Sequence, residues 1–184
     1  MPSIRWILFK KNRLESAEIA AYSKAVVRLI KASIRALEKQ SEKLVDLIET
    51  IISTHQELKT NRELLQSIKG IGDVTSRYLL TEIYHGRFNS ASQCAAYFGL
   101  VPVPHQSGKM MKTRLSKRGN RKIKAKLYMA AIVAKQHNPV LKQHYDRLIA
   151  RGKCKMSALC AVMRRLVQIC FGVIKHQKAF CLPA

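Results

Sequence analysis

The densest chemical signal in the chain is a run of cationic side chains between residues 109 and 126. None of these eighteen residues is acidic, and nine are basic: Lys109, Lys112, Arg114, Lys117, Arg118, Arg121, Lys122, Lys124 and Lys126. A run of one sign repels itself unless an anion binds to it. The run therefore predicts a phosphate-binding surface rather than a solvated face.

The charge of the whole chain points to the same kind of partner. Its 184 residues carry 34 Lys and Arg against 11 Asp and Glu, a net charge of +23. Residues 83–184 hold 20 of the basic residues and a single acid, Asp146. We therefore expect a polyanionic partner. Two-metal phosphodiester cleavage needs several converging carboxylates, so we expect no metal site in this half of the chain.

Cysteine usage and hydropathy indicate a cytoplasmic protein. The five cysteines form no C-x-x-C pair, and Cys160 and Cys170 lie among apolar residues, which predicts reduced core thiols and no zinc site. The first 13 residues lack the ordered charge and cleavage pattern of a signal peptide. The longest clearly apolar stretch, residues 169–174, is far shorter than a membrane span. We therefore predict no membrane segment.

A second candidate phosphate contact is the sequence Gly70-Ile71-Gly72, which lies between two helical patterns in residues 65–80. This segment resembles the helix-hairpin-helix motif of DNA-repair and recombination proteins. Glycines can adopt left-handed backbone angles and let backbone amides approach a phosphate at a helix N-terminus. Gly70 and Gly72 are therefore predicted to contact nucleic acid. The alternative is an ordinary corner between two helices.

A long amphipathic helix is predicted ahead of this motif. From Ile30 to Leu65, eight of eleven positions spaced alternately by four and three residues are apolar, with no Pro or Gly between them. This spacing is typical of a coiled coil, in which His55 and Arg62 would set the register. We expect the stripe to pair with a second copy or with a full-length relative. The alternative is one helix lying on a globular domain.

The remaining segments predict a compact helical domain. Ser90 and Gln93 form a capping box, and Pro102 and Pro104 favour an extended loop that presents Ser107. Further helices are predicted from about residue 120 to 135, from Pro139 to Gly152, and from 156 to 174, the last at the centre of the bundle. The fold class is therefore all-α, with an N-terminal extension (1–26), a coiled-coil-type helix (27–64) and a helical DNA-binding domain (65–184).

Five motifs in order resemble the C-terminal domain of the Piv-invertase-related insertion-sequence transposases, which are guided by a bridge RNA. They are Ser67–Gly72, Phe88–Ser90, Tyr97–Pro102, His105–Lys109 and Ser116–Arg121. The resemblance covers roughly residues 65–178, and residues 30–64 resemble the coiled coil that precedes this domain.

The resemblance implies a two-part active site. Members of the family carry a RuvC-like domain with four metal-binding acids, and their C-terminal domain contributes a serine that links covalently to DNA; by motif position this serine is Ser107. A loop serine beside Lys109 suits attack on a phosphodiester, although such a serine outside this motif is typically a turn residue. His105 is a weaker candidate for the general base of Ser107, because side chains two residues apart on an extended segment tend to point the same way.

The chain departs from the family pattern because it carries no RuvC-like segment and only three aspartates. We therefore expect a shortened member that binds DNA but cannot cleave it alone, with no cofactor of its own and Mg²⁺ only in the presence of a RuvC-like domain. A guide RNA is a further partner that the resemblance allows. The alternative is a non-catalytic helical nucleic-acid-binding protein in which Ser107 is structural.

Overall fold

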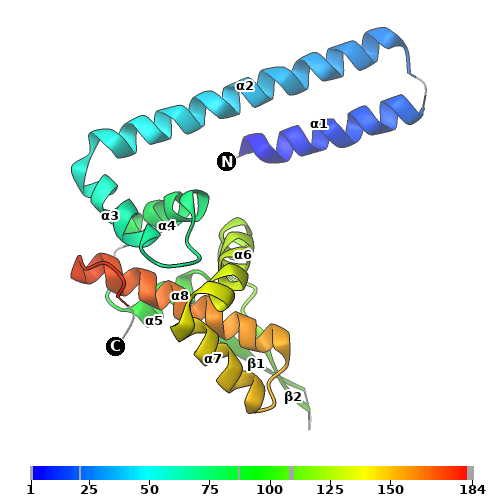
Figure 1. Ribbon diagram of the computed structural model, residues 1–184. Helices are drawn as coiled ribbons and strands as arrows, with labels where there is room; N and C mark the ends of the chain where they lie inside the picture. Colours follow the sequence, from blue (N-terminus) through cyan, green and yellow to red (C-terminus); the bar gives the residue numbers. More distant parts are fainter. Residues whose placement is uncertain (1, 21, 87, 108–109, 182–184) are drawn as a thin grey trace. The chain divides into compact units, whose positions relative to one another are not determined.

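The computed structural model describes residues 2–20, 22–86, 88–107 and 110–181. Within this part of the chain there are eight helices and one two-stranded sheet, which confirms the all-α prediction (Figure 1). Contacts divide the chain into two compact units, residues 1–56 and residues 57–184.

The first unit is a pair of packed helices, α1 (Pro2–Ile19) and α2 (Lys24–Thr54). Ala17 of α1 is fully buried in a small apolar cluster with Ile30 and Ile34 of α2. Two ion pairs join the helices, Lys11 to Glu38 at 2.8 Å and Glu18 to Lys31 at 2.9 Å. The segment treated as an extension in the sequence is therefore a helix that covers the first part of the apolar stripe.

The single helix expected over residues 27–64 is two helices, because α2 ends at Thr54 and α3 spans Gln56–Gln66. His55 between them has extended backbone angles, φ −98° and ψ 106°. Before the break, the hydroxyls of Ser53 and Thr54 donate to the carbonyl of Thr50, at 2.8 and 2.7 Å. Ser and Thr side chains that bond to nearby carbonyls weaken a helix, which explains why a stripe with continuous spacing is interrupted here.

The second unit is built around α8 (Lys155–His176). Three helices pack on it: α5 (Ala91–Tyr97), α6 (Arg121–His137) and α7 (Pro139–Ala150). The buried side of α8 includes Val162, Leu166 and Val167, which are all completely inaccessible to solvent. A further helix of this unit, α4 (Asp73–His85), contacts α6. The prediction that the last helix forms the centre of the bundle is confirmed.

Among the described residues, α8 is the one helix that is long and apolar enough to cross a membrane, with a mean hydropathy of 1.6 over its most apolar stretch. Half of that stretch is buried inside the protein. Because its apolar face packs against α5, α6 and α7, α8 has the characteristics of a core helix.

Side-chain caps set the helix boundaries in this unit. Ser90 Oγ accepts from the Gln93 amide at 3.1 Å, which confirms the predicted Ser90 cap. The Gln93 side chain accepts from the Asn89 amide at 2.9 Å, and not from the Ser90 amide as a capping box predicts. Asn138 is fully buried between α6 and α7, and its Oδ1 accepts from the Val140 and Leu141 amides. Since Pro139 follows it, the chain ends one helix and begins the next there.

The cysteines match the expected thiol chemistry in part. All five are free; Cys94 and Cys170 are fully buried, whereas Cys160 is only partly buried. Burial raises the pKa of Cys94 to about 12 and also raises that of Cys170. These two thiols are protonated core side chains at neutral pH.

Candidate nucleic-acid interface

The segment expected to be a loop is a β-hairpin. Strand β1 (Pro102–Ser107) pairs antiparallel with β2 (Met110–Leu115). The two prolines of β1 are two residues apart, so both missing N–H groups fall on one edge and the alternate residues remain able to pair. The prediction of an extended backbone at the two prolines is correct for β1. Its partner β2 comes from the cationic run, where the sequence predicts no strand.

This hairpin places Ser107 at the last position of β1, with Met110 as its Cα partner. Lys112 pairs with His105, and the exposed Arg114 pairs with Val103. Lys109 lies outside the described residues. At the other end of the hairpin, the Ser116 amide donates to the Val101 carbonyl at 2.9 Å, which closes the base.

Two glycine turns interlock at this base. Gly99 (φ 67°) and Gly119 (φ 88°) both have left-handed backbone angles. A Cβ on Gly119 would lie 2.6 Å from the Phe98 carbonyl oxygen, and one on Gly99 would strike the Arg118 carbonyl. Only glycine fits either position, because a side chain would meet both strain and a neighbouring backbone. The turns after α5 and before α6 are thereby held together.

Lys124 belongs to this scaffold and not to the open surface. Its Nζ donates to the Ser116 carbonyl at 2.8 Å and also to the Arg118 carbonyl. Partial burial lowers the pKa of Lys124, and the nearby charge of Arg121 lowers it further. Lys126 lies over the Tyr78 ring at 4.7 Å. Two of the nine basic residues assigned to one phosphate surface are therefore engaged inside the protein.

One carboxylate that is not among the sequence candidates forms hydrogen bonds near the two glycine turns. Glu82 of α4 accepts a hydrogen bond from the Tyr97 hydroxyl at 3.1 Å and one from Asn120 Nδ2 at 3.4 Å. Its hydrogen bond and its charge raise the pKa of Tyr97. The sequence offers one clue, since Glu82 is the last acid before a stretch without acids that continues to Asp146. Glu82 joins α4 to the end of α5 and the start of α6.

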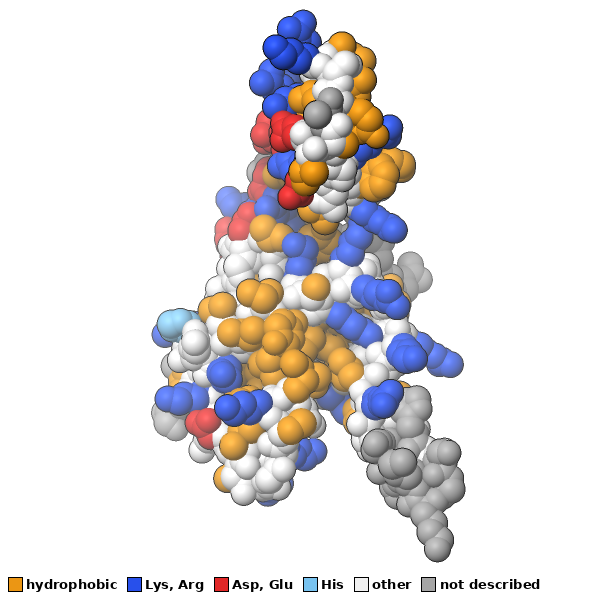
Figure 2. Space-filling view, turned by 90° about the vertical axis from the view of Figure 1, so that its right-hand side faces the viewer, with side chains coloured by type: hydrophobic (Ala, Val, Ile, Leu, Met, Phe, Trp, Pro, Cys, Tyr) orange, Lys and Arg blue, Asp and Glu red, His pale blue; other side chains and the backbone are white. Residues whose placement is uncertain are grey.

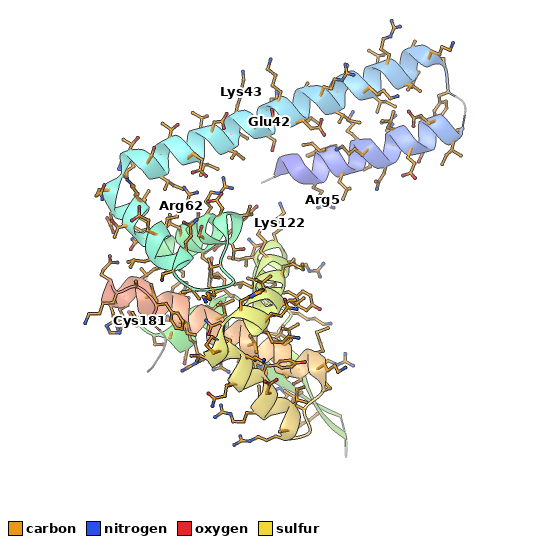
Figure 3. All side chains as sticks on the ribbon, viewed as in Figure 1. Arg5, Glu42, Lys43, Arg62, Lys122 and Cys181 are labelled. Carbon is orange, nitrogen blue, oxygen red and sulfur yellow. The ribbon has the colours of Figure 1, made fainter. Side chains whose placement is uncertain are left out.

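The start of α6 exposes further cations of this run. Lys117, Arg118 and Arg121 are all exposed, and Lys122 projects from the first turn of α6 (Figure 3). Asn120 Oδ1 caps this helix by accepting from the Lys122 amide at 2.9 Å. The first turn contains no acid. A helix N-terminus is a positive pole, so cations placed there favour the binding of an anion.

The charge division of the sequence is also visible in three dimensions. On the face drawn in Figure 2, acidic side chains gather on the helices of the first unit, whereas Lys and Arg predominate over the second. This is the distribution expected if the second unit holds the phosphate contacts.

The two glycines of the other candidate contact differ in what the fold requires of them. Gly70 (φ 108°) needs its left-handed angle, but a Cβ there would lie 2.5 Å from Ala134 Cβ and 2.9 Å from the Ala130 carbonyl. Gly70 is thus required for the packing of α6. Gly72 is extended, with φ −90° and ψ 179°, and has open space around it. Phosphate contact at Gly72 stays a prediction.

The start of α4 already carries its own anion. Asp73, in the first turn of α4, pairs with Arg62 of α3, and its Oδ2 atom lies 2.9 Å from Arg77 Nη2. Gln66 Nε2 donates to the same carboxylate at 3.3 Å. The hydrogen bond from Arg62, together with the charge of Arg77, lowers the pKa of Asp73 against the effect of burial.

The described residues do not fit a magnesium ion. They contain no group of three or more His, Cys, Asp or Glu side chains placed to hold a metal. The Glu82 carboxylate already accepts hydrogen bonds from Tyr97 and Asn120. No metal-dependent step can be derived from this part of the chain.

Comparison with known proteins gives the interface a context. Residues 62–146 match the Transposase IS116/IS110/IS902 family. The pilin gene-inverting proteins of Moraxella bovis and Moraxella lacunata are each 31% identical over 182 residues, which cover 96% of this chain and 54% of theirs. The insertion element IS110 uncharacterized 43.6 kDa protein of Streptomyces coelicolor is 28% identical over 82% of this chain and 36% of its own length. The chain thus spans about half, or less, of these relatives.

Proposed function

Because residues 62–146 match the IS116/IS110/IS902 transposase family, we propose that this chain is part of a DNA transposase or invertase that binds DNA and contributes Ser107 as its nucleophile. The observation that carries the proposal is the position of Ser107 at the end of β1, on a hairpin whose base bears exposed cations. The pilin gene-inverting proteins are named for the inversion of a gene, and this is why the proposal includes an invertase.

The reaction is transesterification at phosphorus. The Ser107 Oγ attacks a DNA phosphate, the bond from Oγ to phosphorus forms and one ester bond to a sugar oxygen breaks. The serine proton is lost and the departing sugar oxygen gains a proton, so that no oxidant, reductant or nucleotide cofactor is needed. Exposed cations such as Arg114, Lys117 and Arg118 would bind neighbouring phosphates and position the strand.

The described residues supply no carboxylate cluster, so the proposal assigns metal chemistry to a RuvC-like domain outside them. Residues 1–184 are therefore expected to bind DNA in the cytoplasm but not to cleave it alone. A guide RNA is included as a partner that would select the DNA site.

Covalent capture tests the nucleophile. The chain is mixed with supercoiled DNA, Mg²⁺ and a RuvC-like domain, supplied in trans or grafted ahead of α1, and the adduct is mapped by mass spectrometry. The adduct should form on Ser107 and disappear in Ser107→Ala, while duplex affinity stays nearly unchanged because one hydroxyl contributes little beside the charges.

Two outcomes would contradict this assignment. An adduct that persists in Ser107→Ala, or that maps to Thr113 or Ser116, would remove Ser107 from its role. If DNA binds but no adduct forms with any RuvC-like partner, the chain would instead be a non-catalytic nucleic-acid-binding protein.

The proposal also includes self-association through the first unit. Leu44 and Ile51 of α2, two apolar positions of the stripe, are 48% and 54% exposed, so α1 leaves this part of the stripe uncovered. A row of exposed apolar side chains on a helix is typical of a pairing surface, and we expect a second copy or a full-length relative to cover it. Leu44→Glu with Ile48→Glu should dissociate the oligomer in sedimentation while the second unit stays folded; a wild-type protein that is monomeric at high concentration would contradict the pairing.

A further inference from the structure

A groove between α7 and α8 carries charge that the cationic run of the sequence does not include. It is open, has a volume of about 1030 Å³, and is lined by residues from Pro139 to Arg147 and from Ala161 to Gln168. Four cations line it against one acid, Asp146; they are Lys142, Arg147, Arg164 and Arg165. None of the residues of the hairpin or of the start of α6 lines this groove.

The helices that carry these cations are firmly packed. On α7, Leu141 is fully buried and Leu148 nearly so, and on α8 Val162 and Leu166 are fully buried. The two walls of the groove are therefore fixed by the core, and the cations project from rigid backbone. Preorganised charges bind an anion with less loss of conformational entropy than charges on a mobile loop.

An imidazole lies among these charges. The Arg147 Nη2 atom is 3.0 Å from His144 Nδ1. Partial burial lowers the pKa of His144, and the charges of Arg147 and Arg165 lower it further. The imidazole therefore stays neutral at pH 7, and its protonation is a sensitive measure of how much positive charge in the groove is neutralised by a ligand.

The lining residues indicate which anion fits. Three of the four cations are arginines, whose planar guanidinium groups match phosphate oxygens in pairs. No Phe, Tyr or Trp is among the lining residues. Proteins that bind single strands combine a cationic groove with aromatic side chains on which bases stack. A groove with the cations but without those aromatics suits a backbone whose bases are already paired.

We propose that the α7–α8 groove binds the phosphate backbone of a DNA duplex, as a contact additional to the hairpin and the start of α6. The choice of DNA over another polyanion rests on the proposed function. The groove would extend the bound length of DNA or hold a second segment of it, and in both cases it adds phosphate contacts without reading bases.

Charge-removing variants of the full chain test the groove. Arg164→Gln with Arg165→Gln should weaken binding to a mixed-sequence DNA duplex about tenfold at low salt and reduce the salt slope of log Kd by about 2, since each lost phosphate contact lowers it by about 0.9. Lys142→Gln with Arg147→Gln, on the other wall, should act alike. The matched control is Lys153→Gln with Lys178→Gln, two exposed cations outside the lining.

The control should leave the slope within about 0.5 of the wild type. If the wild type binds duplex and both groove variants match the control, the groove proposal fails while the proposed function stands. If the wild type binds no DNA at all, the proposed function itself fails. If the groove variants lose affinity only for structured RNA or for single-stranded DNA, the duplex occupant is wrong.

Nuclear magnetic resonance of His144 gives an independent measurement. Its pKa is followed in the full chain with and without inorganic phosphate, and then with a short duplex. Because a bound phosphate opposes the charges of Arg147 and Arg165, the pKa should rise by about 0.5–1 unit with either probe. An unchanged His144 pKa under saturating duplex would overturn the proposal, whatever Ser107 does.

Discussion

The starts of α4 and α6 follow similar glycine-containing turns but differ in how their charge is balanced. At α4, Asp73 supplies an anion to the positive end of the helix and is itself held by Arg62 and Arg77. At α6, the first turn has no acid, and Arg121 is exposed beside the capping residue Asn120. The sequence motifs suggested phosphate contacts at both turns.

The difference teaches that a glycine turn before a helix is not enough to identify a phosphate site. The carboxylate of Asp73 lies in the first turn of α4, where an external anion would gain most. The acid beside the start of α6, Glu82, lies outside the first turn and accepts hydrogen bonds from Tyr97 and Asn120, so the first turn itself holds no acid. We therefore rank α6 above α4 as the DNA contact, and the following experiments test that ranking.

Gly70→Val should have the largest effect, and the effect should be on stability. The new side chain would meet Ala134 and the Ala130 carbonyl of α6, at a backbone angle that valine rarely adopts. We expect a loss of about 3 kcal/mol or more in the free energy of unfolding, measured by urea denaturation. A loss below about 1 kcal/mol would contradict the role of Gly70 in packing.

Lys117→Glu with Arg121→Glu should lower duplex DNA affinity roughly tenfold or more at low salt, because each change removes a cation and adds an anion beside the start of α6. The melting temperature should change little, since both side chains are exposed. Lys153→Glu with Lys178→Glu, which makes the same change of charge at two exposed positions elsewhere, is the control for nonspecific electrostatics. Unchanged affinity in the α6 variant would reverse the ranking.

Asp73→Asn should destabilise the protein by about 0.5–1 kcal/mol, a small value because the carboxylate is half exposed and screened by solvent. The pKa of Asp73 is lowered in the folded state, so its contribution is complete above its unfolded pKa and is lost as pH falls through the folded value. Unfolding of wild type and variant should therefore differ at pH 6 and converge in strong acid. A constant difference across this range would exclude an ionic contribution.

Gly72→Val should have the smallest effect. Its backbone is extended and a Cβ meets nothing, so stability should fall by less than about 1 kcal/mol, mainly from the change at the N-cap. If Gly72 contacts phosphate, duplex affinity should still fall measurably, by about two- to threefold, because a side chain would obstruct the approach. Affinity that falls no more than stability predicts would assign Gly72 to the fold alone.

Local sequence patterns predicted most of the second unit. The helix predicted from about residue 120 is α6, and its buried residues recur with the helical period: Ile123, Leu127, Ala130, Ala131 and Ala134. The helix starts at Ser90 and Pro139 were also predicted correctly. Capping and the 3.6-residue period depend on neighbours within a few positions, so they can be recognised in a single sequence.

Tertiary structure decided which charges are available to a ligand. Lys124 and Arg121 belong to the same basic run, yet Lys124 bonds the carbonyls of a turn while Arg121 stays exposed. Arg147 and Arg164 are distant in sequence but line one groove, because packing on α8 sets the two helices beside each other. The sequence determined the total charge and the helices that carry it. Burial and long-range packing determined where that charge can meet a phosphate, since these depend on residues far apart in the chain.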